Sequence, residues 1–330
     1  METRIVKGEQ GIQEGARIVR AGGVVAFPTE TVYGLAANAF DPQAVRAVFA
    51  AKGRPADNPL IVHLASKNDI PLVTSGYDKK YDALIAAFMP GPLTLVMPRK
   101  SCIPDEVTAG LDTVGVRIPS SPVGSRFLAA CKVPVAAPSA NLSTHISPTT
   151  AEHVYEDMKG RIPLIIDGGE CSVGIESTVL DITGETPVVL RPGAVTAEMI
   201  AGVLNVDVKA HSGKVIAAAP APGMKYKHYA PACDCVVASD MSAALACYAE
   251  RLAEGRSPMI LCRSENVKKS GGARCIALGL GDAEVCRNMY AALHNAEKIA
   301  DYIICEDLGD KGVAASVMNR VNKAAGGKRI

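Results

Sequence analysis

The feature that most constrains the fold is a short apolar run that ends in a polar turn. Residues 23–27, GVVAF, have the length and composition of a buried strand, and Pro28 stops that strand. Three hydroxyl side chains, Thr29, Thr31 and Tyr33, follow before the next glycine. Proteins that combine strands and helices build polar pockets at strand ends. The run therefore predicts an α/β domain with a small-molecule pocket at this strand end.

Two further motifs indicate that the ligand is an anion. Lys52 and Arg54 stand two residues apart, with Gly53 between them and Pro55 after them, which is typical of a loop where two cations converge on one anion. Ser139 and Asn141 follow the apolar run 133–137 through a proline. Small side chains at such a turn let backbone N–H groups approach a phosphate closely. The two motifs favour a ligand that carries phosphate.

Two arginines stand at the ends of predicted strands. Arg117 follows the residues VGV and Arg191 follows VVL, and each comes shortly before a proline. An arginine at a strand end is well placed to point into a crevice, where its planar guanidinium recognises a carboxylate or a phosphate. The alternative for each is an ordinary surface ion pair.

Many short strands with few helices precede residue 209. Helices are predicted over 12–21, 43–52, 79–88 and 151–158, and strands over 24–27, 61–64, 93–98, 115–118, 135–137, 164–167, 177–181 and 188–191. This pattern indicates a twisted, mixed sheet rather than a repeating βαβ unit.

The periodic patterns stop between about residues 209 and 232, where the segment AAAPAPGMKYKHYAP begins with prolines that hold it extended. Beyond it, strands (235–238, 258–263, 274–278, 302–306) alternate with helices (241–254, 283–300, 312–325). Such alternation predicts a smaller, parallel, Rossmann-like sheet. We therefore expect a first domain over 1–208, a linker over 209–232 that closes as a lid, and a small α/β C-terminal domain over 233–330.

One glycine pair in this last part could be mistaken for a nucleotide motif. Gly279 and Gly281 follow a strand and open a helix, as in a dinucleotide-binding fingerprint. Glu284 stands where that fingerprint needs a small residue, and a carboxylate in the first helical turn favours ordinary capping. A tight turn is the better interpretation.

Composition limits the classes of protein. The chain has 330 residues, 48% of them hydrophobic, and a formal net charge of +1, so no general positive field attracts nucleic acid. The start, METRIVKGEQ, has no apolar signal region, and no apolar run reaches the length of a membrane span. The ten cysteines form no CxxC pair, which argues against zinc and favours reduced thiols in a cytoplasmic protein.

The three motifs together resemble the threonylcarbamoyl-AMP synthase family, the YrdC-like enzymes. The resemblance covers about residues 8–205, and residues 222–231 look like the linker of the long, two-domain members. It implies a YrdC-like catalytic domain over 1–208. It also implies a nucleotidyltransferase that condenses L-threonine, bicarbonate or CO2, and ATP into threonylcarbamoyl-AMP and pyrophosphate. The product would serve tRNA threonylcarbamoyladenosine modification through a downstream transferase complex.

The resemblance also assigns site residues. It implies catalytic roles for Lys52, Arg54, Ser139 and Asn141. Threonine would be bound by Thr31, His63, Arg117, Ala137 through its backbone, and Ser177. ATP would be bound by Arg54, Asn58, Thr113, Ser139, Ser147, Arg191 and Tyr226. Magnesium is expected mainly through the ATP phosphates, with Glu176 a weaker candidate for the metal or the amine, and no organic cofactor is expected.

Some of these residues have plainer interpretations. His63 lies on an apolar strand, where most histidines are satisfied core residues, and Ser147 could simply cap the helix over 151–158. No general base for threonine is visible, so that proton is left to water. Two other classes remain open: a non-catalytic RNA-binding module, disfavoured by the charge and the 4% aromatic content, and a carbamoyl-transfer domain of hydrogenase maturation.

Overall fold

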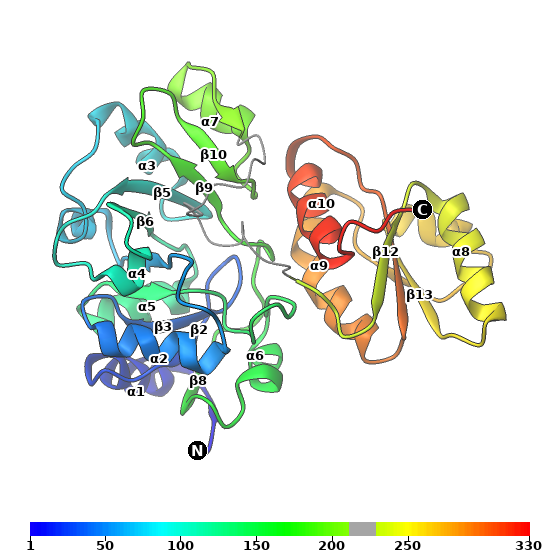
Figure 1. The fold of residues 1–330 in the computed structure, drawn as a ribbon, viewed down its shortest axis with the longest axis horizontal. Helices are drawn as coiled ribbons and strands as arrows, with labels where there is room; N and C mark the ends of the chain where they lie inside the picture. The colour runs from blue at the N-terminus through cyan, green and yellow to red at the C-terminus, as the bar shows by residue number, and fades with distance from the viewer. Residues whose placement is uncertain (211–228) are drawn as a thin grey trace. The chain divides into compact units, whose positions relative to one another are not determined.

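The computed structural model describes residues 1–210 and 229–330 (Figure 1). The chain divides into two compact units. Described residues up to 210 form the first unit, except for the two short loops Thr144–Ser147 and Val173–Ile175, which group with residues 229–330 in the second. The predicted lid and its ATP contact Tyr226 lie outside the described residues.

An eleven-stranded mixed sheet forms the first unit. In spatial order its strands are β1 (Arg4–Lys7), β8 (Leu164–Asp167), β2 (Val25–Phe27), β3 (Gly34–Asn38), β7 (Val135–Ala137), β4 (Ile61–His63), β6 (Thr113–Arg117), β5 (Leu93–Pro98), β9 (Thr178–Asp181), β10 (Val188–Arg191) and β11 (Lys209–Ala210). Parallel and antiparallel pairs occur side by side, as in β4 with β6 and β6 with β5. The prediction of a mixed sheet is confirmed, although β1, β3 and β11 were not foreseen.

Short helices flank this sheet. They are α1 (Gly8–Arg20), α2 (Pro42–Lys52), α3 (Asp82–Phe88), α4 (Asp105–Thr108), α5 (Pro122–Cys131), α6 (Ala151–Met158) and α7 (Ala197–Leu204), with 3₁₀ turns η1 (Lys67–Leu72) and η2 (Lys79–Tyr81). Helix α2 shows why the bounds fall where they do. Asp41 caps its start by accepting the N–H groups of Gln43 and Ala44, and Gly53, with φ of 61°, ends it in the left-handed conformation. The helix predicted over 79–88 is divided into η2 and α3.

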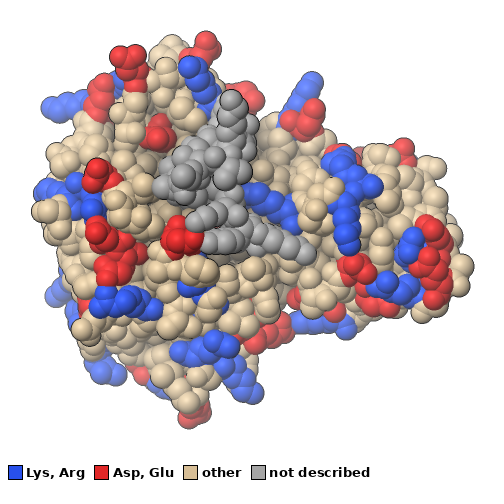
Figure 2. Space-filling model, viewed as in Figure 1, with Lys and Arg blue, Asp and Glu red and all other residues tan. Residues whose placement is uncertain are grey.

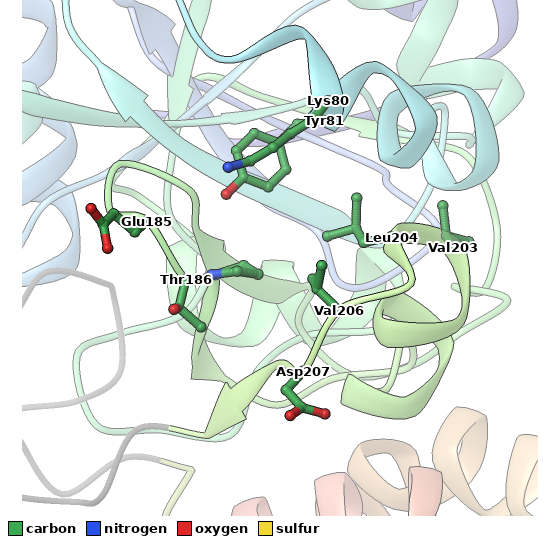
Figure 3. A pocket seen from close by; sticks show the side chains of 9 residues that line it. Lys80, Tyr81, Glu185, Thr186, Val203, Leu204, Val206 and Asp207 are labelled. Carbon is green, nitrogen blue, oxygen red and sulfur yellow. The ribbon is translucent and has the colours of Figure 1, made fainter.

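Charged side chains of both signs are interspersed over the face of the molecule drawn in Figure 2, in keeping with the formal net charge of +1. A hollow of about 310 Å³ opens between η2, the turn that joins β9 to β10, and the end of α7. Lys80 and Tyr81 form one wall of this hollow, and Thr186, Leu204 and Val206 lie opposite (Figure 3). None of the predicted site residues lines it.

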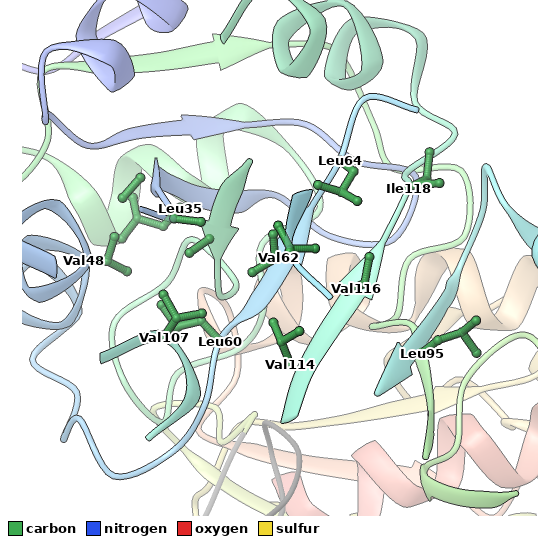
Figure 4. Packing of buried hydrophobic residues seen from close by; sticks show 14 of the residues in the cluster. Leu35, Val48, Leu60, Val62, Leu64, Leu95, Val107, Val114, Val116 and Ile118 are labelled. Atoms are coloured by element: carbon green, nitrogen blue, oxygen red, sulfur yellow. The ribbon is translucent and has the colours of Figure 1, made fainter. Parts of the chain in front are cut away.

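The two faces of the large sheet carry different side chains. On one face Val62, Val116 and Leu95 pair in register across three strands and lie in the larger hydrophobic core (Figure 4). On the other face, α1 and α5 cover a smaller core that includes Phe27 and Val135. This second face therefore changes character at β4, where His63 stands in register beside Val135.

The second unit is a four-stranded, all-parallel sheet with three α-helices. Its strands are β12 (Asp234–Ala238), β15 (Tyr302–Glu306), β13 (Pro258–Cys262) and β14 (Cys275–Ala277). Its α-helices are α8 (Met241–Ala253), α9 (Asp282–Glu297) and α10 (Gly312–Ala324), and η3 (Ser264–Lys269) is a 3₁₀ turn. The predicted Rossmann-like alternation is confirmed. Glu284 accepts the N–H of Leu280 at 2.9 Å, so the glycine turn has the capping carboxylate that its sequence indicates.

The ten cysteines are present as thiols rather than disulfides, and seven of them are buried. In the part of the chain that the structure describes, no helix has both the length and the apolar character needed to cross a bilayer.

Candidate functional site

The three sequence motifs meet beside β3 and β7. The N–H of Leu35 donates to the carbonyl of Pro138 at 2.8 Å, and the N–H of Ala140 donates to the carbonyl of Tyr33 at 2.8 Å. Lys52 reaches the same turn, because its Nζ donates to the carbonyl of Asn141 at 2.7 Å and also contacts the carbonyl of Ser139. Residues more than 80 positions apart are thereby fixed as one cluster.

The prediction that Lys52 lies in a loop is wrong. It is the last residue of α2, only 3% exposed, and its third contact is the Oδ1 of Asn141 at 3.2 Å. Burial, and then the nearby charge of Arg54, hold the pKa of the Lys52 amine well below its usual range. Lys52 therefore anchors the Ser139–Asn141 turn, because its nitrogen is occupied by oxygens of that turn.

Arg54 and Asn58 lie at the other side of Gly53. The guanidinium of Arg54 donates to the carbonyl of Asn58 at 3.1 Å and lies 5.7 Å from the centre of the Phe49 ring. The side chain of Asn58 is fully buried, yet neither its Oδ1 nor its Nδ2 has a hydrogen-bond partner among the described residues. A buried amide in that state is costly and indicates that a ligand completes its bonds.

Three polar side chains stand in one row across β4, β6 and β5. His63 on β4 is in register with Arg117 on β6, and Arg117 is in register with Thr94 on β5. Residues paired in register point to the same face. All three are buried, at 4%, 4% and 0% exposure. The row joins the predicted His63 and Arg117 and adds Thr94, which the sequence analysis missed.

Arg117 has a partner that sequence reasoning did not find. Glu30, 4% exposed, places its Oε1 2.8 Å from Nη2 of Arg117, and its Oε2 accepts the N–H of Ser120 at 3.0 Å. The alternative of an ordinary surface ion pair is wrong for Arg117, because this pair is buried. A carboxylate between the hydroxyls of Thr29 and Thr31, next to a buried strand, was the signal in the sequence.

His63 is held in its neutral form. Burial, and then the charge of Arg117, lower its pKa to about 3. Its Nδ1 lies 3.1 Å from the carbonyl of Ile61, which acts as the acceptor, so Nδ1 carries the proton and Nε2 is left as an acceptor. A neutral imidazole of this kind can accept a hydrogen bond from a substrate hydroxyl.

Ser177 links the row to Arg191. Its Oγ lies 2.8 Å from Oγ1 of Thr94, and it accepts a bond from Nη2 of Arg191 at 3.2 Å. Nε of Arg191 donates to the carbonyl of Ser177 at 3.1 Å. The structure therefore brings Ser177 and Arg191, predicted for threonine and ATP respectively, into direct contact.

The remaining predicted residues are more scattered. Oγ1 of Thr31 lies 2.8 Å from Oγ1 of Thr29, and Ala137 and Thr113 lie on β7 and β6. Among the described residues, the hydroxyl of Tyr33 makes no hydrogen bond with a predicted site residue; it donates to the carbonyl of Gly169 at 2.8 Å.

Ser147 is buried in the second unit, where its carbonyl lies 3.3 Å from Nε2 of His294. Ser147 does not cap α6: the cap is Thr150, which accepts the N–H of His153 at 3.2 Å. Glu176 is also buried. Within residues 1–210 and 229–330 no group of three or more His, Cys, Asp or Glu is placed to hold a metal ion.

The fold and this site together define a class: an α/β protein whose mixed sheet carries buried arginines and hydroxyls for a small, polar, anionic ligand. Comparisons with known proteins make the class specific. The family model for Sua5, YciO and YrdC, described as "Telomere recombination", matches residues 17–193. The model described as "Threonylcarbamoyl-AMP synthase, C-terminal domain" matches residues 195–326. The chain belongs to the Sua5/YciO/YrdC family.

Full-length relatives support this assignment. The chain is 42% identical to the threonylcarbamoyl-AMP synthase of Pyrococcus abyssi, covering 96% of this chain and 95% of that protein. It is 41% identical to the Bacillus subtilis protein of the same name, covering 97% and 94%. The crystal structure of P. abyssi Sua5 complexed with L-threonine superposes with a TM-score of 0.94 at 40% identity, over 100% of this chain and 99% of that one.

Proposed function

We propose that this chain is a threonylcarbamoyl-AMP synthase and acts as a nucleotidyltransferase. In that reaction the nitrogen of L-threonine forms a carbamate with bicarbonate or CO2. The carbamate oxygen then attacks the α-phosphorus of ATP, and pyrophosphate leaves. One observation carries the proposal most directly: the row His63–Arg117–Thr94 lies in a chain 42% identical, almost end to end, to a protein named for this activity.

The buried row suits a small hydroxy amino acid. Arg117 would bind the carboxylate through its guanidinium, and the acceptor Nε2 of His63 would take the proton of the side-chain hydroxyl. Thr31, Ser177 and the backbone of Ala137 would complete the threonine site. A site whose polar groups bond a hydroxyl rejects a ligand without one, since those groups are then left unpaired.

The nucleotide would occupy the neighbouring cations and amides. Asn58 supports this assignment, because its buried amide lacks partners, and Arg54 lies directly beside it. Thr113, Ser139, Ser147 and Arg191 are the further proposed ATP contacts. Lys52, Arg54, Ser139 and Asn141 would form the catalytic cluster, with Lys52 holding the Ser139–Asn141 turn against the triphosphate.

Magnesium would enter with ATP, held by phosphate oxygens, because the described residues provide no carboxylate cage for it. Bicarbonate or CO2 would be the third substrate. A threonylcarbamoyl transferase complex would then consume the labile product, and any direct contact with tRNA would be weak.

The test is pyrophosphate release with ATP, threonine and bicarbonate, each omitted in turn. We expect release only in the complete mixture, with valine a poor replacement for threonine and serine a weaker one because it lacks the methyl contact. Equal release with valine and threonine would sink the assignment.

A further inference from the structure

The Glu30–Arg117 pair has an unusual geometry. The two charged atoms, Oε1 and Nη2, are 2.8 Å apart, but they lack the alignment of a hydrogen bond, and neither has another hydrogen-bond partner among the described residues. Both side chains are almost fully buried. A buried ion pair offsets its desolvation only when the remaining hydrogen-bonding positions are filled. One carboxylate oxygen and one guanidinium nitrogen therefore stand side by side, and each has hydrogen-bonding positions that no described residue fills.

An α-amino acid fills both positions at once. It carries a carboxylate and an ammonium on a single carbon, so its anion can face Nη2 of Arg117 while its cation faces Oε1 of Glu30. The other oxygen of Glu30 is fixed by the N–H of Ser120 at 3.0 Å, which holds the free oxygen in place. A carboxylate ligand without an amine would satisfy only half of this pair.

Resting on the proposed function, we propose that Glu30 binds the ammonium of threonine and accepts its first proton, making it the catalytic base for carbamate formation. The proton passes from nitrogen to Oε1, which leaves a neutral amine and a protonated carboxyl group. The nitrogen lone pair then forms the N–C bond with CO2, and one C=O π pair moves onto oxygen. The second proton leaves nitrogen for water, so the products are the carbamate and two protons.

The groups around Glu30 are compatible with this role. Among the described residues, Arg117 on β6 is the cation paired with Glu30, and burial first and then its charge lower the pKa of His63 on β4, which stays neutral. Cys171, in the loop after β8, also faces Glu30. Burial first, and then the charge of Glu30, raise the pKa of its thiol, so it remains uncharged.

The experiment compares Glu30→Gln with the wild-type chain in steady-state pyrophosphate release from pH 7 to pH 9. The amide keeps the shape of the carboxylate but cannot take the proton, so the variant must use threonine that is already neutral. We expect kcat at pH 7 to fall by about 10²–10⁴-fold. The ratio of wild-type to variant kcat should then shrink as pH rises, by at most about tenfold per pH unit, because the amine deprotonates in solution. A ratio that stays constant with pH would show a purely structural role and overturn the inference.

Glu170→Gln is the matched control. It makes the same chemical change at an exposed residue next to Cys171, and its kcat and pH profile should equal those of the wild type. If Glu30→Gln does not fold, Glu30→Asp provides the test. Aspartate keeps the negative charge on the side of Arg117, but its shorter side chain withdraws the carboxylate from the ammonium of threonine. We expect Glu30→Asp to lose more than tenfold in kcat with the KM for ATP unchanged, and a wild-type kcat would overturn the inference. An inactive wild-type chain would instead overturn the proposed function.

Discussion

The two faces of the eleven-stranded sheet differ along β4, β6 and β5, although their residues alternate along the same strands. The core face carries Val62, Val116 and Leu95, and the site face carries His63, Arg117 and Thr94. Each pair consists of chain neighbours, so a shift of one residue exchanges a core position for a site position. The difference teaches that stability and function are separated here by the two-residue period of a strand, not by distance along the chain.

The two faces also make opposite contributions to folding. The core face removes branched aliphatic side chains from water, and each such burial stabilises the fold by roughly 1.5–3 kcal/mol. The site face buries Arg117, Glu30 and a neutral His63, whose desolvation opposes folding. The burial energy of the core face therefore offsets the desolvation cost of the site face. Substitutions on the core face should change stability, and substitutions on the site face should change activity.

Arg117→Ala should have the largest effect. It removes the proposed carboxylate ligand, so turnover should fall by about 10³-fold or more. It also leaves Glu30 buried without its partner, which should lower the free energy of unfolding by about 3–5 kcal/mol. Pyrophosphate release and urea unfolding measure the two effects.

The double variant Glu30→Leu/Arg117→Met separates these two effects. Replacing a buried ion pair by apolar side chains is often neutral, so stability should return close to the wild-type value while activity stays absent. Recovered activity in the double variant would show that the charged pair serves the fold rather than the reaction.

His63→Gln tests the site face through pH. The pKa of His63 is about 3 in the folded chain and about 6.5 when unfolded. Between these pH values only the unfolded chain takes up the proton. The contribution of His63 to the free energy of unfolding is therefore fully present above pH 6.5 and is lost as pH falls toward 3. The loss should approach about 4–5 kcal/mol near pH 3. Unfolding free energies measured from pH 7 to pH 4 should fall less steeply in the variant; parallel curves would mean that His63 is not held neutral.

Arg54→Ala extends the comparison beyond the sheet. The residue follows Gly53 and contacts the carbonyl of Asn58, so its loss should leave the core face intact. We expect turnover to fall by about 10²-fold, as for other preorganised charges on a transition state, with little change in the unfolding midpoint. If stability and activity fell together, Arg54 would be a structural residue.

Sequence patterns were enough for the fold and for most of the site's residue types. The strands over 93–98, 135–137, 164–167, 188–191 and 302–306 have the predicted bounds, because short apolar runs bounded by proline, glycine or aspartate leave few alternatives. Strand β3, GLAAN, was missed because small residues carry little strand preference, and its place depends on pairing with β2 and β7.

Contacts between side chains far apart in sequence could not be predicted. Lys52 looked like a loop cation, but its nitrogen is occupied by the turn that carries Ser139 and Asn141, 87 and 89 residues away. Glu30 was missed since its partner Arg117 meets it only through strand order. A sequence shows which residue types are present, whereas the sheet register decides which of them meet.

Val116→Ala should have the smallest effect on activity and completes the comparison. The side chain of Val116 is fully buried in the larger core and stands next to Arg117 along β6. Removing two methyl groups should lower the free energy of unfolding by about 2–3 kcal/mol through lost transfer energy and the cavity left behind. Turnover at 25 °C should stay within about twofold of the wild type, because β6 keeps its register and Arg117 its direction. If turnover fell sharply while the variant was fully folded, core packing would set the position of Arg117. The two faces would then not be independent.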